Sequence, residues 1–230
     1  IPLQHPVGNG IVYSSRFWDE AQASQTLLDN IEGTMLTQPR TIRFQPGQRH
    51  QTWSGNCVAL GLASGFLEPI ESTSIHLIQR GIVRLLQMFP ANGISSSDIE
   101  EYNRQTSAEI EHIRDFIVLH YHVTSRQDTP FWNTCREMEI PASLRHRIEL
   151  FRETGRVFRV PNELFAENSW IQVMLGQGIL PQQHHPVADL MGDAELSQFL
   201  DGIRSGIQST VAKLPSHEAY IRSYCAAPQS

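Results

Sequence analysis

Residues 53–75 gather the side chains best suited to chemistry. Two acids, Glu68 and Glu71, stand in a short loop, and three hydroxyl residues follow at positions 72–74. Each hydroxyl could cap the helix that the apolar spacing over residues 75–89 predicts. The free amides and positive dipole end of that helix would face the acidic loop and could hold a small anion or an electron-rich ring edge. An ordinary capped helix after a glycine-rich turn is the alternative, and spacing alone does not separate the two.

Small residues precede this loop. Gly55, Gly61 and Gly65 let the backbone pass close to a flat or bulky group, because glycine has no side chain to obstruct it. Pro69 stops any helix before the acidic loop is complete. The stretch therefore predicts a close approach between backbone and ligand, followed by a helix start.

The run from Gly55 to Ile78 closely resembles the flavin-dependent tryptophan halogenase family. Shorter matches to the same family cover most of the chain, at Ile1–His5, Gly8–Tyr13, Arg114–Ile117, Asp128–Trp132, Ile148–Arg152 and Met174–Pro181. The family also carries a Gly-x-Gly-x-x-Gly fingerprint, a catalytic lysine after it and a Trp-x-Trp-x-Ile-Pro motif. The chain has no such fingerprint, because Tyr13 stands where the third glycine after Gly8-x-Gly10 would be. The chain thus looks like the C-terminal part of such an enzyme, with a missing N-terminal segment.

The resemblance implies a reaction and roles for residues. Reduced FAD (FADH2), supplied by a separate flavin reductase, reacts with oxygen and chloride or bromide, and hypohalous acid then halogenates tryptophan or an indole-like ring in a separate pocket. Glu71 matches the carboxylate that steers the electrophile and accepts the ring proton. Thr73 and Ser74 match the pair whose backbone amides bind halide; many relatives have glycine at the second position, an exchange that is tolerated if φ stays negative. The residues expected to line the flavin are Trp53, Gly55, Asn56, Pro69 and Ser72.

The substrate region departs from the tryptophan-specific members of the family. Those members hold the amino-acid part of tryptophan with a tyrosine pair and a glutamate, whereas residues 155–165 are shorter here and contain no tyrosine. Phe131, Trp132 and Phe165 remain as expected aromatic contacts for the substrate. A site that lacks these hydrogen bonds discriminates less between substrates with and without the amino-acid part. We therefore expect the substrate preference to shift toward free indole-like rings, as in an indole-type branch of the family.

The expected fold class is α+β and predominantly α-helical. Residues 1–92 are expected to form the C-terminal part of a flavin-binding module with few strands, and residues 93–230 a helical substrate-binding region, with the Gly/Ser-rich residues 91–97 at the boundary. The patterns predict helices at 19–31, 75–89, 98–124, 131–138, 142–154, 169–176, 185–191 and 194–214, strands at 41–44 and 50–53, and an extended run at 11–15.

Composition and charge exclude other classes. A net charge of −6 without a lysine or arginine cluster argues against nucleic acid or an anionic membrane as partner. No apolar run approaches the roughly 20 residues of a membrane span, so a cytoplasmic location is the default expectation. His120 and His122 point away from each other on a helix, and the three cysteines lack Cys-x-x-Cys spacing, so no metal site is expected.

Two other functions compete with the halogenase. A flavin monooxygenase would hydroxylate its substrate, but it would lack the Glu-Ser-Thr start of the helix at residues 71–73. A non-enzymatic helical interaction module derived from the family is the second alternative. The isolated chain is expected neither to halogenate nor to bind FAD tightly, because the glycines that cradle the phosphates are absent.

The lysine count leads to a first prediction. Lys213 is the only lysine of the chain and falls in the last turn of the helix predicted at 194–214, where a cation is favoured and exposed. An arginine cannot offer a free amine to hypohalous acid. We therefore expect the catalytic lysine to lie outside this chain, and Lys213→Arg to keep the halogenation rate of the whole enzyme within about twofold, roughly 0.4 kcal/mol on the barrier. Loss of halogenation by a folded Lys213→Arg enzyme would contradict this.

Overall fold

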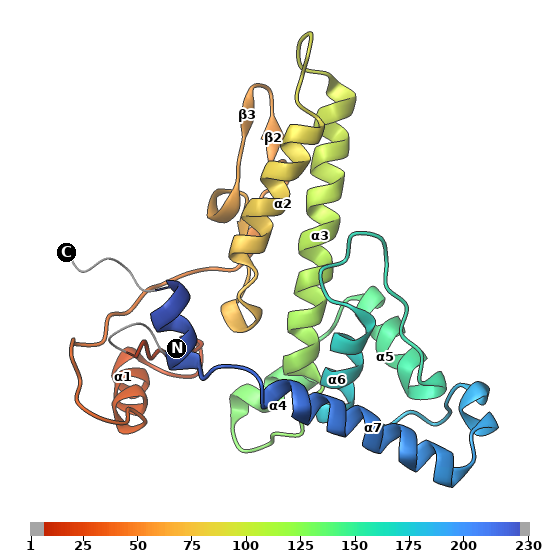
Figure 1. Ribbon diagram of the computed structural model, residues 1–230. Coiled ribbons are helices and arrows are strands. Elements are labelled where there is room, and N and C mark those ends of the chain that lie inside the picture. The colour runs from red at the N-terminus through yellow and green to blue at the C-terminus, as the bar shows by residue number, and fades with distance from the viewer. Residues whose placement is uncertain (1–6, 226–230) are drawn as a thin grey trace. The chain divides into compact units, whose positions relative to one another are not determined.

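The computed structural model describes residues 7–225 and divides the chain into two compact units. One unit comprises residues 43–185, and the other combines residues 1–42 with residues 186–230. The fold is predominantly helical with few short strands, as predicted (Figure 1). The segment Ile1–His5, which resembles the family in sequence, lies outside the described residues.

Short strands open the unit formed by residues 43–185. β1 (Gly47–Gln48) pairs antiparallel with β4 (Gly65–Phe66), and β2 (Trp53–Ser54) pairs with β3 (Cys57–Val58) in a tight hairpin. The hairpin turn contains Gly55 at φ 56°, a left-handed conformation that glycine adopts without strain.

The predicted strands are largely wrong. Residues 41–44 and 11–15 form no strand, and of residues 50–53 only Trp53 belongs to one. These segments have side chains typical of strands, but a strand needs a neighbour to hydrogen-bond, and the described part of the chain offers none alongside them.

Five α-helices follow in this unit. They are α2 (Ser74–Gln87), α3 (Ser96–His122), α4 (Pro130–Glu137), α5 (Ala142–Thr154) and α6 (Glu167–Gly176). Each was predicted from apolar spacing to within two residues at either end, because caps and prolines mark most of the boundaries. Ser95 caps α3 with its hydroxyl, Thr129 caps α4, and Gly155 ends α5 at φ 70°.

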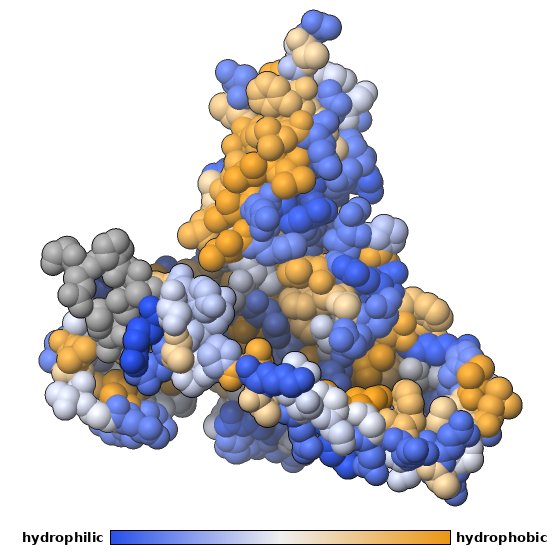
Figure 2. Space-filling model, viewed as in Figure 1, coloured by the Kyte–Doolittle hydropathy of each residue, from blue (hydrophilic) through white to orange (hydrophobic). Residues whose placement is uncertain are grey.

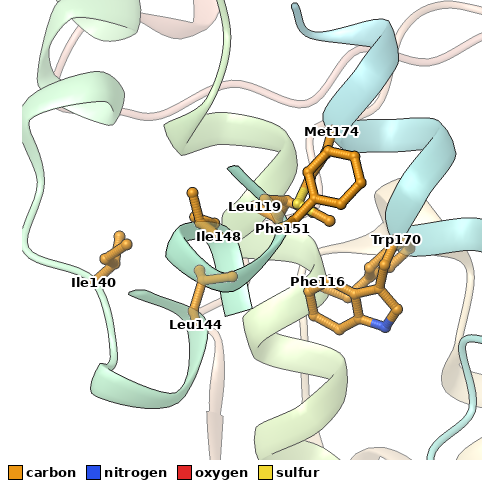
Figure 3. Packing of buried hydrophobic residues seen from close by; sticks show 8 residues of the cluster. All are labelled: Phe116, Leu119, Ile140, Leu144, Ile148, Phe151, Trp170 and Met174. Carbon is orange, nitrogen blue, oxygen red and sulfur yellow. The ribbon is translucent and has the colours of Figure 1, made fainter. Parts of the chain in front are cut away.

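The apolar core lies where α3, α5 and α6 meet (Figure 3). Its buried members are Phe116, Leu119, Ile140, Leu144, Ile148, Phe151, Trp170 and Met174. Phe116 meets the edge of Trp170 with ring centroids 4.8 Å apart. The C-terminal half of α3 is therefore held rigidly, since close-packed side chains leave little room to move.

α2 packs on α3 through polar side chains. The Glu109 carboxylate of α3 accepts from Arg84 at 2.7 Å and from Arg80 at 3.2 Å, and lies 3.3 Å from His76. Glu109 and Arg84 are each only 4% exposed, and Arg84 also donates to Thr106 at 2.8 Å. A buried charge is tolerated only when paired and hydrogen-bonded, so this network fixes how α2 lies along α3.

The apolar face of α2 is turned away from this contact. The predicted amphipathic helix is confirmed, yet Ile75, Leu86 and Phe89 are 67–79% exposed. Figure 2 shows hydrophobic side chains gathered over this part of the molecule. A contiguous exposed apolar face usually marks an interaction surface.

The second unit is also helical. Its elements are α1 (Glu20–Asp29), the 3₁₀ helix Pro186–Leu190, α7 (Asp193–Val211), α8 (His217–Tyr220) and a π-helical turn at Ile221–Cys225. Asp19 and Gln22 form a capping box at the start of α1. The helix predicted at 185–191 is a short 3₁₀ helix instead. Among the described helices of the chain, none is long and apolar enough to cross a membrane.

The expected boundary between residues 92 and 93 stays a prediction about the modules of the whole enzyme. In the structure, the compact unit 43–185 runs through this point. The physical link across it is the ion-pair network between Arg84 of α2 and Glu109 of α3.

We expect Glu109→Ala to lower the free energy of unfolding of this chain by about 3–5 kcal/mol, because it leaves Arg84 buried without its carboxylate. Urea unfolding followed by circular dichroism measures the change. Glu111→Ala is the matched control, an exposed acid on the same helix, and should stay within about 0.5 kcal/mol of the wild type. Equal effects of the two substitutions would show that the network does not carry the contact.

Candidate active site

A sharp bend brings the acidic loop to the start of α2. Pro69 begins a 3₁₀ helix, Pro69–Glu71, in a position where proline's missing amide costs nothing. Ser72 then adopts φ 50° and ψ 41°, and its amide donates to the Pro69 carbonyl at 2.9 Å. A left-handed serine costs roughly 1–2 kcal/mol, and such strain is concentrated at functional sites. The bend sets the direction of the Glu71 side chain.

The start of α2 presents free backbone amides. Thr73 takes the N-cap position at φ −82°, but its side chain makes no cap hydrogen bond, so the predicted hydroxyl cap is not formed. Within residues 7–225, no acceptor lies in hydrogen-bond range of the Thr73 or Ser74 amide. Ser74 does not have a positive φ, so the backbone condition for replacing glycine by serine is met. These amides, at the positive end of the helix, can bind a small anion.

Glu71 is paired with a histidine of α3. Its Oε1 lies 2.9 Å from Nε2 of His120, and the side chains are 28% and 17% exposed. Nδ1 of His120 lies 2.8 Å from the Phe116 carbonyl oxygen one turn earlier. The sequence analysis considered His120 only as a metal ligand, a role that it rejected, and missed the contact with Glu71. The relevant signal was its position one helical turn after Phe116, on the face of α3 that leads to the core.

Glu68 lies beside the next residue of α3. The Tyr121 side chain lies close to the Glu68 carboxylate; burial first, and then the nearby charge of Glu68, raise the pKa of Tyr121 above its ordinary value. Oε2 of Glu68 is buried and has no hydrogen-bond partner among the described residues. The two acids of the loop thus lie beside two consecutive residues at the end of α3.

The expected substrate aromatics fall into two groups. Phe165 stacks on Phe116 with centroids 3.8 Å apart, and the Phe116 ring meets His120 edge-on at 4.8 Å, so Phe165 belongs to the side of Glu71. The second group lies around Tyr121. Its members are Trp132, stacked on Tyr121 at 5.9 Å, Phe131 at 6.1 Å from Tyr121, and Arg126, 4.5 Å above the Trp132 ring.

The expected flavin residues are not brought to one place. Pro69 and Ser72 are exposed in the acidic loop, whereas Gly55 and Asn56 are exposed at the tip of the β2–β3 hairpin. Figure 1 shows this hairpin toward the end of α3 opposite to the loop that precedes α2.

Trp53 supports the hairpin from below. It is 2% exposed, its ring packs on Tyr102 at 5.5 Å, and Nε1 donates to the Gly55 carbonyl at 2.9 Å. Tyr102 and His120 are eighteen residues apart on α3, about 27 Å of helix. Trp53 therefore presents no surface beside Glu71. Of the residues expected to line the flavin, those in the exposed glycine turn and in the exposed Pro69–Ser72 bend could contact it. Both places suit a flat group, because no bulky side chain covers them.

A pocket of about 540 Å³ opens beside the first turns of α2. It is lined by His76, Arg80, Arg159, Val160, Pro161, Asn162, Glu163 and Leu164. Most of this lining comes from residues 155–165, the segment that departs from the tryptophan-specific pattern. Among the described residues, no group of three or more His, Cys, Asp or Glu side chains could hold a metal ion.

The sequence profile described as tryptophan halogenase matches residues 1–193. The chain belongs to the tryptophan halogenase family, which confirms the resemblance seen in Gly55–Ile78.

Individual relatives agree. Tryptophan 6-halogenase SttH from Streptomyces toxytricini is 31% identical over 225 residues, which cover 96% of this chain and 43% of the relative. Among solved structures, Xcc4156, a flavin-dependent halogenase from Xanthomonas campestris, is 67% identical with a TM-score of 0.91, covering 95% of this chain and 44% of that one. BrvH, a flavin-dependent halogenase from Brevundimonas sp. BAL3, is 43% identical with a TM-score of 0.86, covering 91% and 43%. The chain spans less than half the length of these relatives.

We expect Tyr121→Phe to lower the free energy of unfolding by about 1 kcal/mol at pH 7–9, since the half-buried phenol loses its polar interaction with the nearby Glu68 carboxylate. The raised pKa of Tyr121 means that the folded state favours the neutral phenol. This contribution is complete below the ordinary tyrosine pKa of about 10 and is lost as the pH rises above it. The difference between wild type and Tyr121→Phe should therefore shrink above pH 10.

Urea unfolding at several pH values measures this difference. Tyr224→Phe is the control, because Tyr224 is 76% exposed and should show neither effect. A difference that grows above pH 10 would contradict the assignment.

Proposed function

We propose that the whole enzyme containing this chain is a flavin-dependent halogenase, which uses reduced FAD, oxygen and chloride or bromide to halogenate tryptophan or an indole-like ring. One observation carries the proposal. Glu71, whose Oε1 lies 2.9 Å from Nε2 of His120, stands two residues before the free amides of Thr73 and Ser74 at the positive end of α2. A carboxylate next to an anion site is the arrangement that halide use and proton removal both require.

The site residues of this chain have different roles in the reaction. The flavin, when bound, supplies the oxidising equivalents that turn halide into hypohalous acid. The Thr73 and Ser74 amides hold the halide, because a helix N-terminus stabilises an anion. Pro69 and Ser72 would contact the flavin, and the Gly55–Asn56 turn with Trp53 beneath it would contribute a second, separate contact. Glu71 directs the electrophile to the ring carbon and accepts the ring proton.

The substrate is a flat aromatic ring that reaches Glu71. Phe165 supplies a wall on that side through its stack on Phe116, and Phe131 with Trp132 forms the neighbouring wall around Tyr121. The short, tyrosine-free segment 155–165 supports an indole-like substrate over one recognised by its amino-acid part. SttH is named for tryptophan, whereas Xcc4156 and BrvH are described only as flavin-dependent halogenases.

The remainder of the enzyme packs against α2. The exposed apolar face of α2, with Ile75, Leu86 and Phe89, is a surface that an apolar segment would cover. The chain spans less than half the length of its relatives. This supports an N-terminal segment of the whole enzyme, which binds the nucleotide part of FAD, as the segment that covers this face. A separate flavin reductase and a cytoplasmic location complete the proposal.

We expect Glu71→Gln to lower the ring-halogenation rate of the whole enzyme by about 100-fold or more while hypohalous acid production continues, because the carboxylate acts only where the electrophile meets the ring. Product formation is measured by chromatography, and hypohalous acid by a thiol trap in the absence of substrate.

Glu68→Gln is the matched control from the same loop. The amide keeps a polar group of the same size beside Tyr121, so halogenation should remain within about fivefold, roughly 1 kcal/mol. Equal loss of halogenation and of hypohalous acid in Glu71→Gln would show that Glu71 serves the flavin instead.

A further inference from the structure

We propose that His120 is a positioning residue for Glu71 that also takes over the proton which Glu71 removes from the aromatic ring. The proposal rests on the proposed function, because it concerns the same carboxylate. Its basis is a three-membered chain of contacts: the Phe116 carbonyl, the two nitrogens of His120 and Oε1 of Glu71.

The orientation of the His120 ring is set from two sides. Nδ1 lies 2.8 Å from the Phe116 carbonyl oxygen, and the Phe116 ring packs against the imidazole at 4.8 Å and 87°. Phe116 is itself a buried member of the core. The imidazole is therefore held by a rigid part of α3 rather than by the mobile end of a long side chain.

The hydrogen bond to Phe116 determines whether the nitrogen that faces Glu71 carries a hydrogen or a lone pair. A carbonyl oxygen only accepts, so Nδ1 must carry a hydrogen and donate. In the neutral ring, Nε2 is then the acceptor, and it lies 2.9 Å from Oε1 of Glu71. An ionised Glu71 beside this lone pair has no hydrogen to share, but a protonated Glu71 donates directly to it. The contact therefore becomes a hydrogen bond once Glu71 has taken a proton from the ring.

The proton balance closes without any further reagent. The halogen of hypohalous acid bonds to the ring carbon as the oxygen–halogen bond breaks and hydroxide leaves with the electron pair. The carbon–hydrogen electron pair returns to the ring, and the proton passes to Glu71 and on to Nε2 of His120. Glu71 is ionised again for the next turnover. Because the His120 side chain is 17% exposed, the imidazolium can release the proton to water.

The other titratable groups near Glu71 and His120 have other partners or lie on another face of α3. Glu68 of the same loop lies close to Tyr121, the neighbour of His120 on α3. His122 lies two positions along the helix, which places it on another face. Glu109, on the side of α3 that faces α2, is occupied by Arg80, Arg84 and His76. In the described part of the chain, His120 is the group placed to receive a proton from Glu71.

The test compares whole enzymes that carry His120→Gln, His120→Phe or no substitution. Glutamine keeps a polar side chain beside Glu71 but cannot take its proton, whereas phenylalanine keeps only the ring contact with Phe116. We expect kcat for ring halogenation to fall at least about tenfold in His120→Gln, with KM for the substrate within about twofold. Hypohalous acid production should stay within about twofold in both variants, which also shows that they fold.

Deuterium at the reacting ring carbon provides the decisive readout. In His120→Gln, the proton taken from the ring stays on Glu71, and its onward transfer becomes limiting. Deuterium from the ring carbon is carried to Glu71 and slows that transfer, so deuterated substrate should react more slowly than ordinary substrate by a larger factor than in the wild type. His112→Gln is the matched control, a histidine on the same helix two turns earlier with no contact to Glu71, and should behave as the wild type.

The outcomes separate the two proposals. A His120→Gln enzyme with wild-type kcat and an unchanged isotope effect overturns the role of His120 while leaving the halogenase intact. Parallel loss of hypohalous acid and product also overturns it, because His120 would then serve the fold or the flavin. A wild-type enzyme that halogenates no aromatic ring refutes the proposed function itself, and that result needs no variant.

Discussion

A single buried carboxylate, Glu109, determines how α2 and α3 lie together. It accepts from Arg84 and Arg80 and lies beside His76, all on one side of α2, so α2 has one orientation that leaves none of these charges unpaired. The start of α2 carries the free amides and the acidic loop. The register of α2 on α3 therefore decides where Glu71 points.

The end of α3 completes the site. Phe116 and its core neighbours hold this part of the helix rigid, and two consecutive residues beyond them, His120 and Tyr121, lie beside the two acids of the loop. A strained serine at position 72 is tolerated because the Glu71–His120 contact holds the chain before it and the Glu109 network holds α2 after it. The site thus consists of a rigid helix end, a strained loop and a helix start, each supplying one element of the chemistry.

Local patterns predicted most of the helices but few of the strands. Apolar spacing, caps and prolines are properties of neighbouring residues, so α2 to α6 could be placed from the sequence alone. Strands depend on a partner from elsewhere in the chain. Residues 41–44 have the composition of a strand and pair with nothing in the described structure, while two-residue strands formed at β1 and β4, where the sequence shows no clear alternation.

The sequence by itself determined which residues belong to the acidic loop and which family they resemble, because that information lies in a continuous run from Gly55 to Ile78. Only the tertiary structure decided what those residues touch. It paired Glu71 with His120 across 49 positions of sequence, buried Trp53 below its hairpin, and turned the apolar side of α2 outward while the polar side met Glu109. Such contacts depend on how two helices meet, and the spacing within either helix does not contain that information.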